Sequence, residues 1–165
     1  MGAVLPKGIV LHASSVADQR GAFVFLAPSG GGKSSIMIRL SSDSFGAIAD
    51  DSVVIATGSD GVVRCLPCGS MKQNTGTENI GSAPLKGFFF VEKGVSANCS
   101  RVTGKYAFYR AMRSSSIMAY EHLSALERQQ ARLFLSRLFR MFPSKIIRYD
   151  LAENGIQVLN RLVNE

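Results

Sequence analysis

A run of three glycines followed by a lysine, at residues 30–33, constrains the fold of this chain more than any other feature. The apolar run Ala22–Leu26 precedes it, and a helical pattern from about Lys33 to Leu40 follows it. A strand, a glycine-rich turn and a helix in this order are typical of a loop that binds phosphate groups. Residues 27–34 fit the Walker A pattern, with Ala27 at the position of its first glycine. We therefore predict a nucleotide-binding loop within an α/β fold.

The residue types of this loop suit the phosphates of ATP. Without side chains, Gly30, Gly31 and Gly32 allow backbone N–H groups to turn inward around phosphate oxygens, and the start of the helix adds its free N–H groups. Lys33 adds a positive charge, Ser34 supplies the hydroxyl that usually reaches magnesium, and the flanking Ser29 and Ser35 complete the predicted cofactor-binding set. The alternative is a turn that binds nothing, but three consecutive glycines lose more chain entropy than such a turn requires.

Two adjacent carboxylates, Asp50 and Asp51, follow the loop lysine by only 17 and 18 residues (50 − 33 and 51 − 33), and we expect one helix and a short strand between them and the lysine. One of them could hold Mg²⁺ directly or through water while the other accepts a proton from an attacking hydroxyl. Ser34 and Asp50 are the candidate metal ligands, although the sequence does not decide which aspartate is the base. The alternative is an exposed acidic turn or a helix cap.

Short apolar runs and helical periods predict the rest of the fold. Strands are expected at Gly8–His12, Ser52–Ala56, Val62–Leu66, Phe88–Glu92 and Ile146–Leu151, and helices at Ser124–Met141 and, with weaker patterns, Tyr106–Met112 and Gly155–Val163. Ser59–Gly61 should form a hairpin turn, so part of the sheet is antiparallel. Residues 69–83 have no period, and we expect a long loop near the site. The prediction is one domain over 1–165, a mixed sheet flanked by helices.

The long helical pattern carries an apolar stripe of Leu126, Leu133, Leu135, Leu138 and Phe139, with Arg and Gln on its other face. We expect this stripe to form core or a subunit contact.

The formal charge of +7 favours anionic partners such as nucleotides. The basic residues after Leu85 form no run, so a nucleic-acid partner is not expected. No apolar stretch is long enough to span a bilayer, and Met1–Val10 does not resemble a signal peptide, so no membrane association is expected. Three cysteines cannot all pair within one chain, which favours the cytoplasm.

Three segments together resemble the catalytic domain of HPr kinase/phosphorylase, which acts on the histidine-containing phosphocarrier protein of sugar uptake. They are residues 11–21, 27–35 and 48–53, in which a His, the phosphate loop and an Ala-Asp-Asp segment recur at the family's spacing. The later residues 82–92 look like shorter HPr-kinase-related proteins, and the resemblance then covers somewhat over half the chain. Ser35 stands where the family usually has an acidic residue, and the family's glycine-rich signature loop is not found farther on.

This resemblance implies a fold shared with phosphoenolpyruvate carboxykinases, transfer of phosphate from Mg-ATP to a serine hydroxyl of a protein or peptide, and often a homo-oligomeric ring. It implies catalytic roles for Lys33, Asp50 and Asp51, with His12 near the reacting phosphate. In a family member, His12 would lie on the strand before the phosphate loop. Without the resemblance, a histidine in an apolar strand is usually buried and hydrogen-bonded.

Other readings of the sequence stay open. The protein could be a nucleotide-sensing module without chemistry, which the absence of an acidic residue after Ser34 favours, or a small-molecule kinase. Arg110 and Arg113 could clamp a γ-phosphate, although arginines on a helix are more often solvated. Cys65 and Cys68 have the spacing of a zinc half-site, but no second pair completes it. Whether the reaction also runs in reverse is undecided.

Overall fold

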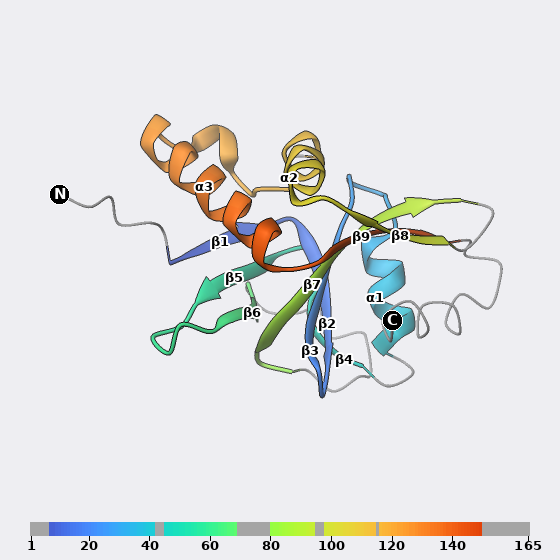
Figure 1. Ribbon diagram of the computed structural model, residues 1–165. Helices are drawn as coiled ribbons and strands as arrows, with labels where there is room; N and C mark the ends of the chain where they lie inside the picture. The colour runs from blue at the N-terminus through green and yellow to red at the C-terminus, as the bar shows by residue number, and fades with distance from the viewer. Residues whose placement is uncertain (1–6, 42–44, 69–79, 95–97, 115, 150–165) are drawn as a thin grey trace.

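The computed structural model describes residues 7–41, 45–68, 80–94, 98–114 and 116–149. Nine strands and three α-helices form the described part of the fold (Figure 1). In chain order they are β1 Gly8–Leu11, β2 Ala13–Asp18, β3 Gly21–Leu26, α1 Lys33–Ser41, β4 Gly46–Ala49, β5 Val53–Thr57, β6 Val63–Pro67, β7 Ala83–Lys93, β8 Asn98–Val102, α2 Gly104–Arg113, a 3₁₀ turn Tyr120–His122, α3 Ala125–Met141 and β9 Ser144–Tyr149.

The strands form one mixed sheet in the order β1-β5-β6-β7-β3-β2-β4, and β9 with β8 joins it along the second half of β7. The pairs β3–β7 and β7–β9 are parallel, and the remaining pairs are antiparallel. This is the predicted class, a mixed sheet flanked by helices. Because β3 and β7 run in the same direction, the phosphate loop after β3 lies beside the carboxyl end of β7.

Both faces of β3 and of the Gly87–Val91 part of β7 are buried, which explains why these segments are continuous apolar runs that do not alternate with polar residues. On β3, Val24 and Leu26 belong to one apolar cluster, while Phe23 and Phe25 belong to the other. On β7 the same alternation separates Phe88 and Phe90 from Phe89 and Val91. These two strands are therefore the centre of the molecule, and they fix the position of the loop between two cores.

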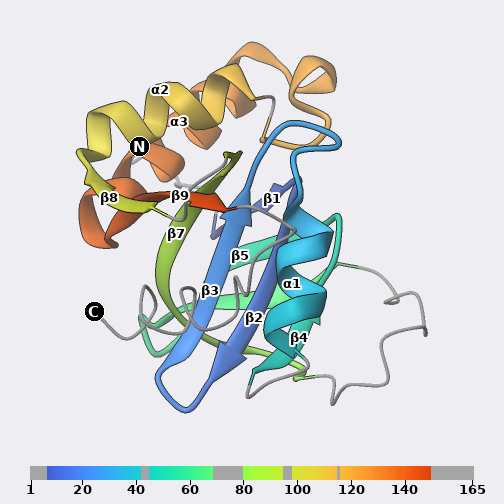
Figure 2. The same cartoon turned by 90° about the vertical axis from the view of Figure 1, so that its right-hand side faces the viewer.

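The helices lie on opposite faces of the sheet (Figures 1 and 2). Helix α1 covers one face with Ile36, Met37 and Leu40, while α2 and α3 pack together over the other face. Ser124 starts α3 with a capping box, in which its hydroxyl accepts from the N–H of Glu127 and the Glu127 carboxylate accepts from the N–H of Ser124.

The predicted stripe of α3 is only partly correct. Leu135, Leu138 and Phe139 are buried as expected, but Leu126 and Leu133 are 60% and 51% exposed. The buried face repeats at intervals of three and four residues from Ala131 through Phe134, Leu135 and Leu138. Leu126 and Leu133 lie off that face.

The structure confirms every strand predicted within its described residues, the hairpin at Ser59–Gly61, and the helices that became α1, α2 and α3. It adds two strands that the sequence did not predict, β2 and β8, and the short strand expected between the loop helix and Asp50 is β4. It corrects the end of the predicted 69–83 loop, because Ala83 begins β7. Residues 69–79 and the helix expected at Gly155–Val163 lie outside the described residues.

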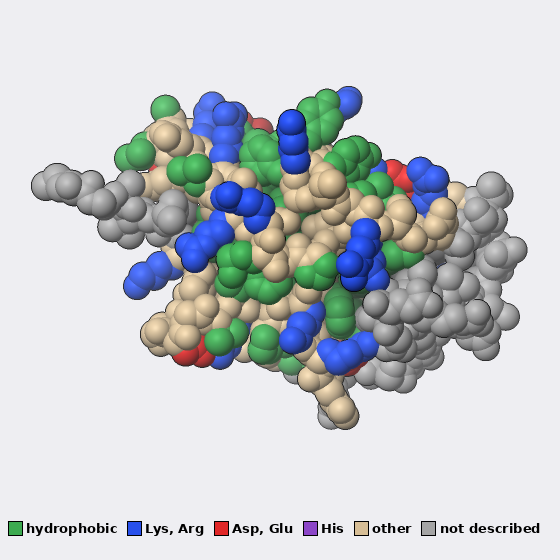
Figure 3. All heavy atoms as spheres, in the orientation of Figure 1, with side chains coloured by type: hydrophobic (Ala, Val, Ile, Leu, Met, Phe, Trp, Pro, Cys, Tyr) green, Lys and Arg blue, Asp and Glu red, His purple; other side chains and the backbone are tan. Residues whose placement is uncertain are grey.

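On the face shown in Figure 3, Lys and Arg side chains are spread singly among apolar ones and form no continuous stripe. Within the described residues, no helix is both long and apolar enough to cross a membrane.

Candidate phosphate-binding site

The glycine-rich loop leaves the end of β3 and returns directly into α1, whose first residue is Lys33. Gly30 and Gly32 take φ values of 72° and 96°, which residues with a side chain rarely adopt. Gly31 has an ordinary φ, but its N–H donates to the carbonyl of Pro28 at 2.9 Å and its α-carbon faces the side chain of Ala27 closely. The loop thus encloses one side of a cavity of about 330 Å³.

Lys33 is buried beneath this loop. Its Nζ donates to the carbonyl oxygens of Ala27 at 2.9 Å and Pro28 at 3.2 Å. Burial lowers the pKa of Lys33, and the nearby carboxylates of Asp51 and Asp50 oppose that effect. An ammonium group held by two carbonyls in a poorly solvated position is stabilised by any anion that enters the cavity.

Asp50 follows β4 and connects the loop to the sheet. Its Oδ1 accepts hydrogen bonds from the hydroxyl of Ser34, at the start of α1, and from the hydroxyl of Ser14, on β2, both at 2.8 Å. The sequence analysis did not identify Ser14, because its role depends on β2 lying between β3 and β4 in the sheet. The two hydroxyls fix the orientation of the Asp50 carboxylate beside Ser34.

Asp51 differs from its neighbour in both exposure and backbone. Its side chain is 74% exposed, and its Oδ1 lies 3.2 Å from Nδ1 of His12. The same ring nitrogen is 3.1 Å from the Asp51 carbonyl oxygen. Asp51 has a φ of 73°, in the left-handed region that aspartate adopts more readily than most residues. Such conformations are concentrated at functional sites.

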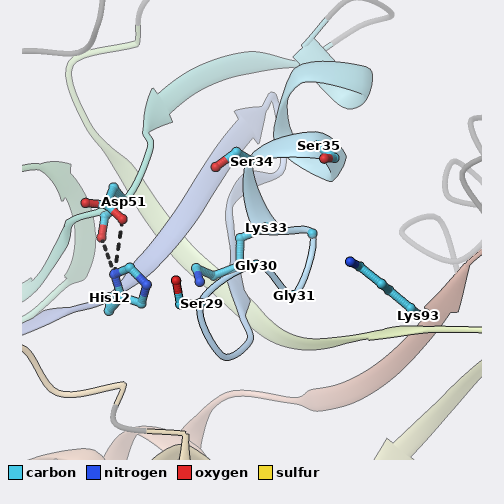
Figure 4. A pocket seen from close by; sticks show the side chains of 10 residues that line it. His12, Ser29, Gly30, Gly31, Lys33, Ser34, Ser35, Asp51 and Lys93 are labelled. Carbon is cyan, nitrogen blue, oxygen red and sulfur yellow. Dashed lines mark hydrogen bonds and ion pairs between the residues drawn. The ribbon is translucent and has the colours of Figure 1, made fainter.

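His12 does not lie on the strand that leads into the phosphate loop. It occupies the junction between β1 and β2, and two strands separate it from the loop in sequence. Its side chain is 27% exposed and points to Asp51 (Figure 4). The sheet brings it to the cavity because β1 pairs with β5, which follows the aspartates directly.

The cavity brings most of the predicted residues together. It is lined by His12, by Asp51 and by the continuous segment Ser29, Gly30, Gly31, Gly32, Lys33, Ser34 and Ser35. Asp50 touches this group through Ser34. Figure 4 shows His12 and Asp51 at one end of the loop and Lys93 at the other.

Lys93, the last residue of β7, is a lining residue that the sequence analysis did not identify. The parallel register of β3 and β7 pairs Leu26 with Phe90, so the residues that follow in both strands reach the same edge of the sheet. Lys93 could be identified only by knowing that β7 pairs with β3. The sequence of neither strand indicates which parallel strand it pairs with.

The residues present fit a magnesium ion. Asp50 and Ser34 place a carboxylate oxygen and a hydroxyl oxygen 2.8 Å apart. Magnesium prefers oxygen ligands and retains several waters. Within the described residues, no group of three or more His, Cys, Asp and Glu side chains forms a metal site. A protein cage for a metal is therefore not found there, whereas a site shared with phosphates and water matches the groups on Asp50 and Ser34.

Two other sequence candidates, Arg110 and the pair Cys65 and Cys68, lie outside the residues that line the phosphate cavity. The guanidinium of Arg110 pairs with Glu92, which also accepts from Nε of Arg148 at 2.7 Å, so Arg110 ties α2 to the sheet. The hydrogen bonds from Arg148 and Arg110 lower the pKa of Glu92 despite its partial burial. Cys65 is buried in β6, and burial raises the pKa of its thiol to about 12, whereas Cys68 is exposed. A buried thiol that stays protonated is a poor zinc ligand.

Sequence comparison finds no matching family model and no matching curated protein. Comparison of the folds gives 34 matching chains among the solved structures. One of them is the HPr(Ser) kinase/phosphatase from Coxiella burnetii, with a TM-score of 0.53 and 8% sequence identity over 94% of this chain and 93% of that chain. At this identity the likeness establishes a shared fold.

Proposed function

We propose that this protein is an ATP-dependent phosphotransferase that moves the γ-phosphate of Mg-ATP to a serine-type hydroxyl of a protein or peptide. The HPr(Ser) kinase/phosphatase shares its fold. The observation that carries the proposal is the arrangement of one cavity: a glycine loop with Lys33 forms its floor, Asp50 is bonded to Ser34, and the exposed carboxylate of Asp51 lies beside His12.

The contacts of the two aspartates support different roles for them. Asp50 is held by two hydroxyls next to the loop, as a metal ligand should be, and Ser34 would share the metal with it. Asp51 is exposed at the cavity and paired with His12, which suits a base that must meet an incoming hydroxyl. We therefore propose Asp50 and Ser34 for the metal and Asp51 for the proton.

The chemistry follows from these positions. The acceptor hydroxyl transfers its proton to the Asp51 carboxylate, its oxygen forms a bond to the γ-phosphorus, and the bond from that phosphorus to the β–γ bridging oxygen breaks, which releases ADP. His12 orients Asp51, and Lys33 exchanges its two carbonyl acceptors for phosphate oxygens and compensates their charge. A bound magnesium ion would neutralise phosphate charge and align the phosphates.

We place this activity in the cytoplasm. Cys65 and Cys68 are free thiols, which suits a reducing compartment.

Three variants test the assignment. Lys33→Ala should lower Mg-ATP affinity at least about 100-fold, because a charge-assisted contact to the phosphates disappears. Asp51→Asn should bind Mg-ATP normally and transfer no phosphate, since asparagine also tolerates a positive φ. Asp50→Asn should weaken the magnesium dependence of binding. Calorimetry measures binding, and labelled ATP with cell extract measures transfer.

Glu121→Gln is a suitable control, because it removes a carboxylate that is 84% exposed on the 3₁₀ turn, outside the residues that line the cavity. It should behave like the natural protein in both assays. Normal transfer by Asp51→Asn, or normal binding by Lys33→Ala, would contradict the proposal. If the natural protein binds Mg-ATP but transfers no phosphate in extract, the protein is a nucleotide-sensing module and not a kinase.

A further inference from the structure

A second pocket, of about 360 Å³, lies against the start of the phosphate loop, at Ala27 and Pro28. Leu26, Ala27 and Pro28 form one wall, Phe90 of β7 lies beside them, and α2 contributes the other wall with Tyr109, Arg110, Arg113 and Ser114. The pocket therefore lies outside the carboxyl ends of two adjacent parallel strands, β3 and β7. Open α/β sheets bind their ligands in crevices at such ends.

The pocket adjoins the end of the phosphate cavity that holds His12. Ser114 lines the pocket, and its hydroxyl lies 2.7 Å from that of Ser116. The carbonyl of Ser116 accepts the backbone N–H of His12 at 2.7 Å. On the other wall, Pro28 is followed directly by Ser29, which lines the phosphate cavity. A compound in this pocket is thus close to the end where the proposed function puts the γ-phosphate.

The two arginines of the pocket differ in charge balance. Arg110 pairs with Glu92, a carboxylate that it shares with Arg148, and its guanidinium lies 5.6 Å from the centre of the Phe90 ring. Arg113 lies 5.8 Å from the centre of the Tyr109 ring, and it pairs with no carboxylate among the described residues. Leu26, Ala27, Phe90 and Tyr109 make the remaining walls largely apolar. A small, largely apolar pocket in which the guanidinium of Arg113 has no carboxylate partner among the described residues favours an organic anion.

Resting on the proposed function, we propose that this pocket binds the phosphate acceptor, a serine-type hydroxyl compound with a carboxylate that pairs with Arg113. Two kinds of acceptor share this chemistry: free serine, and a peptide with an acidic residue beside its serine. In this proposal the nucleobase takes the opposite end of the phosphate cavity, the end that Lys93 and Ser35 line (Figure 4).

Arg113 also lies in the last turn of α2, where a positive charge stabilises the carbonyl end of a helix. That role alone predicts a lower melting temperature for Arg113→Gln and no change in ligand preference. Arg137→Gln is the matched control, because it removes the same charge from an exposed position on α3. Melting curves of both variants separate stability from recognition.

The test uses product analogues with saturating Mg-ADP, and calorimetry first establishes that Mg-ADP binds. O-phospho-L-serine is compared with O-phosphoethanolamine, which lacks the carboxylate, and an acetylated and amidated Glu-phosphoserine-Glu peptide is compared with its Ala-phosphoserine-Ala counterpart. In the natural protein, at least one carboxylate compound should bind about tenfold more tightly than its counterpart, as for one charge-assisted hydrogen bond. Arg113→Gln should abolish this preference and Arg137→Gln should retain it. The pair that shows the preference identifies the source of the carboxylate.

Equal binding within both pairs of compounds, or a preference for the carboxylate compound that survives Arg113→Gln, overturns the inference. If Mg-ADP still binds in these experiments, the proposed function stands. If Arg113→Gln weakens ADP but not pyrophosphate, the pocket holds the base, and the inference is also wrong. Failure of Mg-ADP to bind the natural protein rejects the proposed function itself.

Discussion

Replacement of Gly31 by alanine should disable the phosphate loop without unfolding the protein. A Cβ at residue 31 would lie 2.6 Å from Cβ of Ala27 and 2.8 Å from the carbonyl oxygen of Pro28, whereas ordinary contact begins at 3.4 Å. The loop must therefore open by about 0.8 Å (3.4 − 2.6). Ala27 cannot move away, because it is buried in the apolar cluster that contains Phe25 and Ile36.

A displacement of this size exceeds the tolerance of the N–H groups that would hold phosphate. A hydrogen bond with about 2.9 Å between the loop nitrogen and the phosphate oxygen would lengthen beyond the range of a hydrogen bond. Hydrogen bonds to charged groups contribute about 1.5–3 kcal/mol each. Loss of one or two should cost about 3 kcal/mol, or about 100-fold in Mg-ADP affinity.

Calorimetry with Mg-ADP measures this effect, and two other glycines calibrate it. A Cβ at Gly30 meets nothing within 4 Å, so Gly30→Ala should incur only the strain of its φ of +72°, about 1–2 kcal/mol. A Cβ at Gly81 also meets nothing within 4 Å, and Gly81→Ala should bind like the natural protein. Affinity of Gly31→Ala within about threefold of the natural protein, a change below about 1 kcal/mol, would refute the steric argument.

Two further predictions concern the end of β7. Lys93→Ala should weaken Mg-ADP binding about fivefold, and less at high salt, because it removes an exposed cation from the cavity. The control Lys105→Ala should leave binding unchanged, and equal Mg-ADP affinities for the two variants would show that Lys93 does not contact the nucleotide. Glu92→Gln should lower the free energy of unfolding by about 1 kcal/mol at neutral pH, since Arg110 and Arg148 lose their shared carboxylate. Because the folded pKa of Glu92 lies below the ordinary value of 4.5, this stabilisation is present above 4.5 and disappears as pH falls through the folded pKa. Urea titrations at neutral pH and at successively lower pH check it, and a difference between the variant and the natural protein that stays constant in acid contradicts it.

The parts of the fold that the sequence predicted are those with a local signal. The loop at 27–34 carries its own turn chemistry, and β3 is a continuous apolar run. β2 was missed because its Ser14 and Ser15 are completely buried but polar, so no hydrophobic pattern marks them. β8 lies next to β9 alone and is largely exposed, which leaves little constraint on its residues.

The candidate site divides in the same way. Ser29–Ser35 and the two aspartates are recognisable from short segments, and the structure places them around one cavity. Ser14 and Lys93 reach this region only through pairing between strands that are distant in sequence, β2 with β4 and β3 with β7. Such contacts depend on the register of the whole sheet.

The left-handed backbone of Asp51 also limits how this protein can diverge. Asparagine and glycine are the residues that share its tolerance of positive φ, and most others would strain the turn by about 1–2 kcal/mol. Neither replacement carries a negative charge, so each would remove the proposed base and leave the glycine loop and Asp50 undisturbed. The easiest evolutionary route away from catalysis therefore leads to a folded descendant that still holds nucleotide, and a kinase and a sensor could differ at this single position.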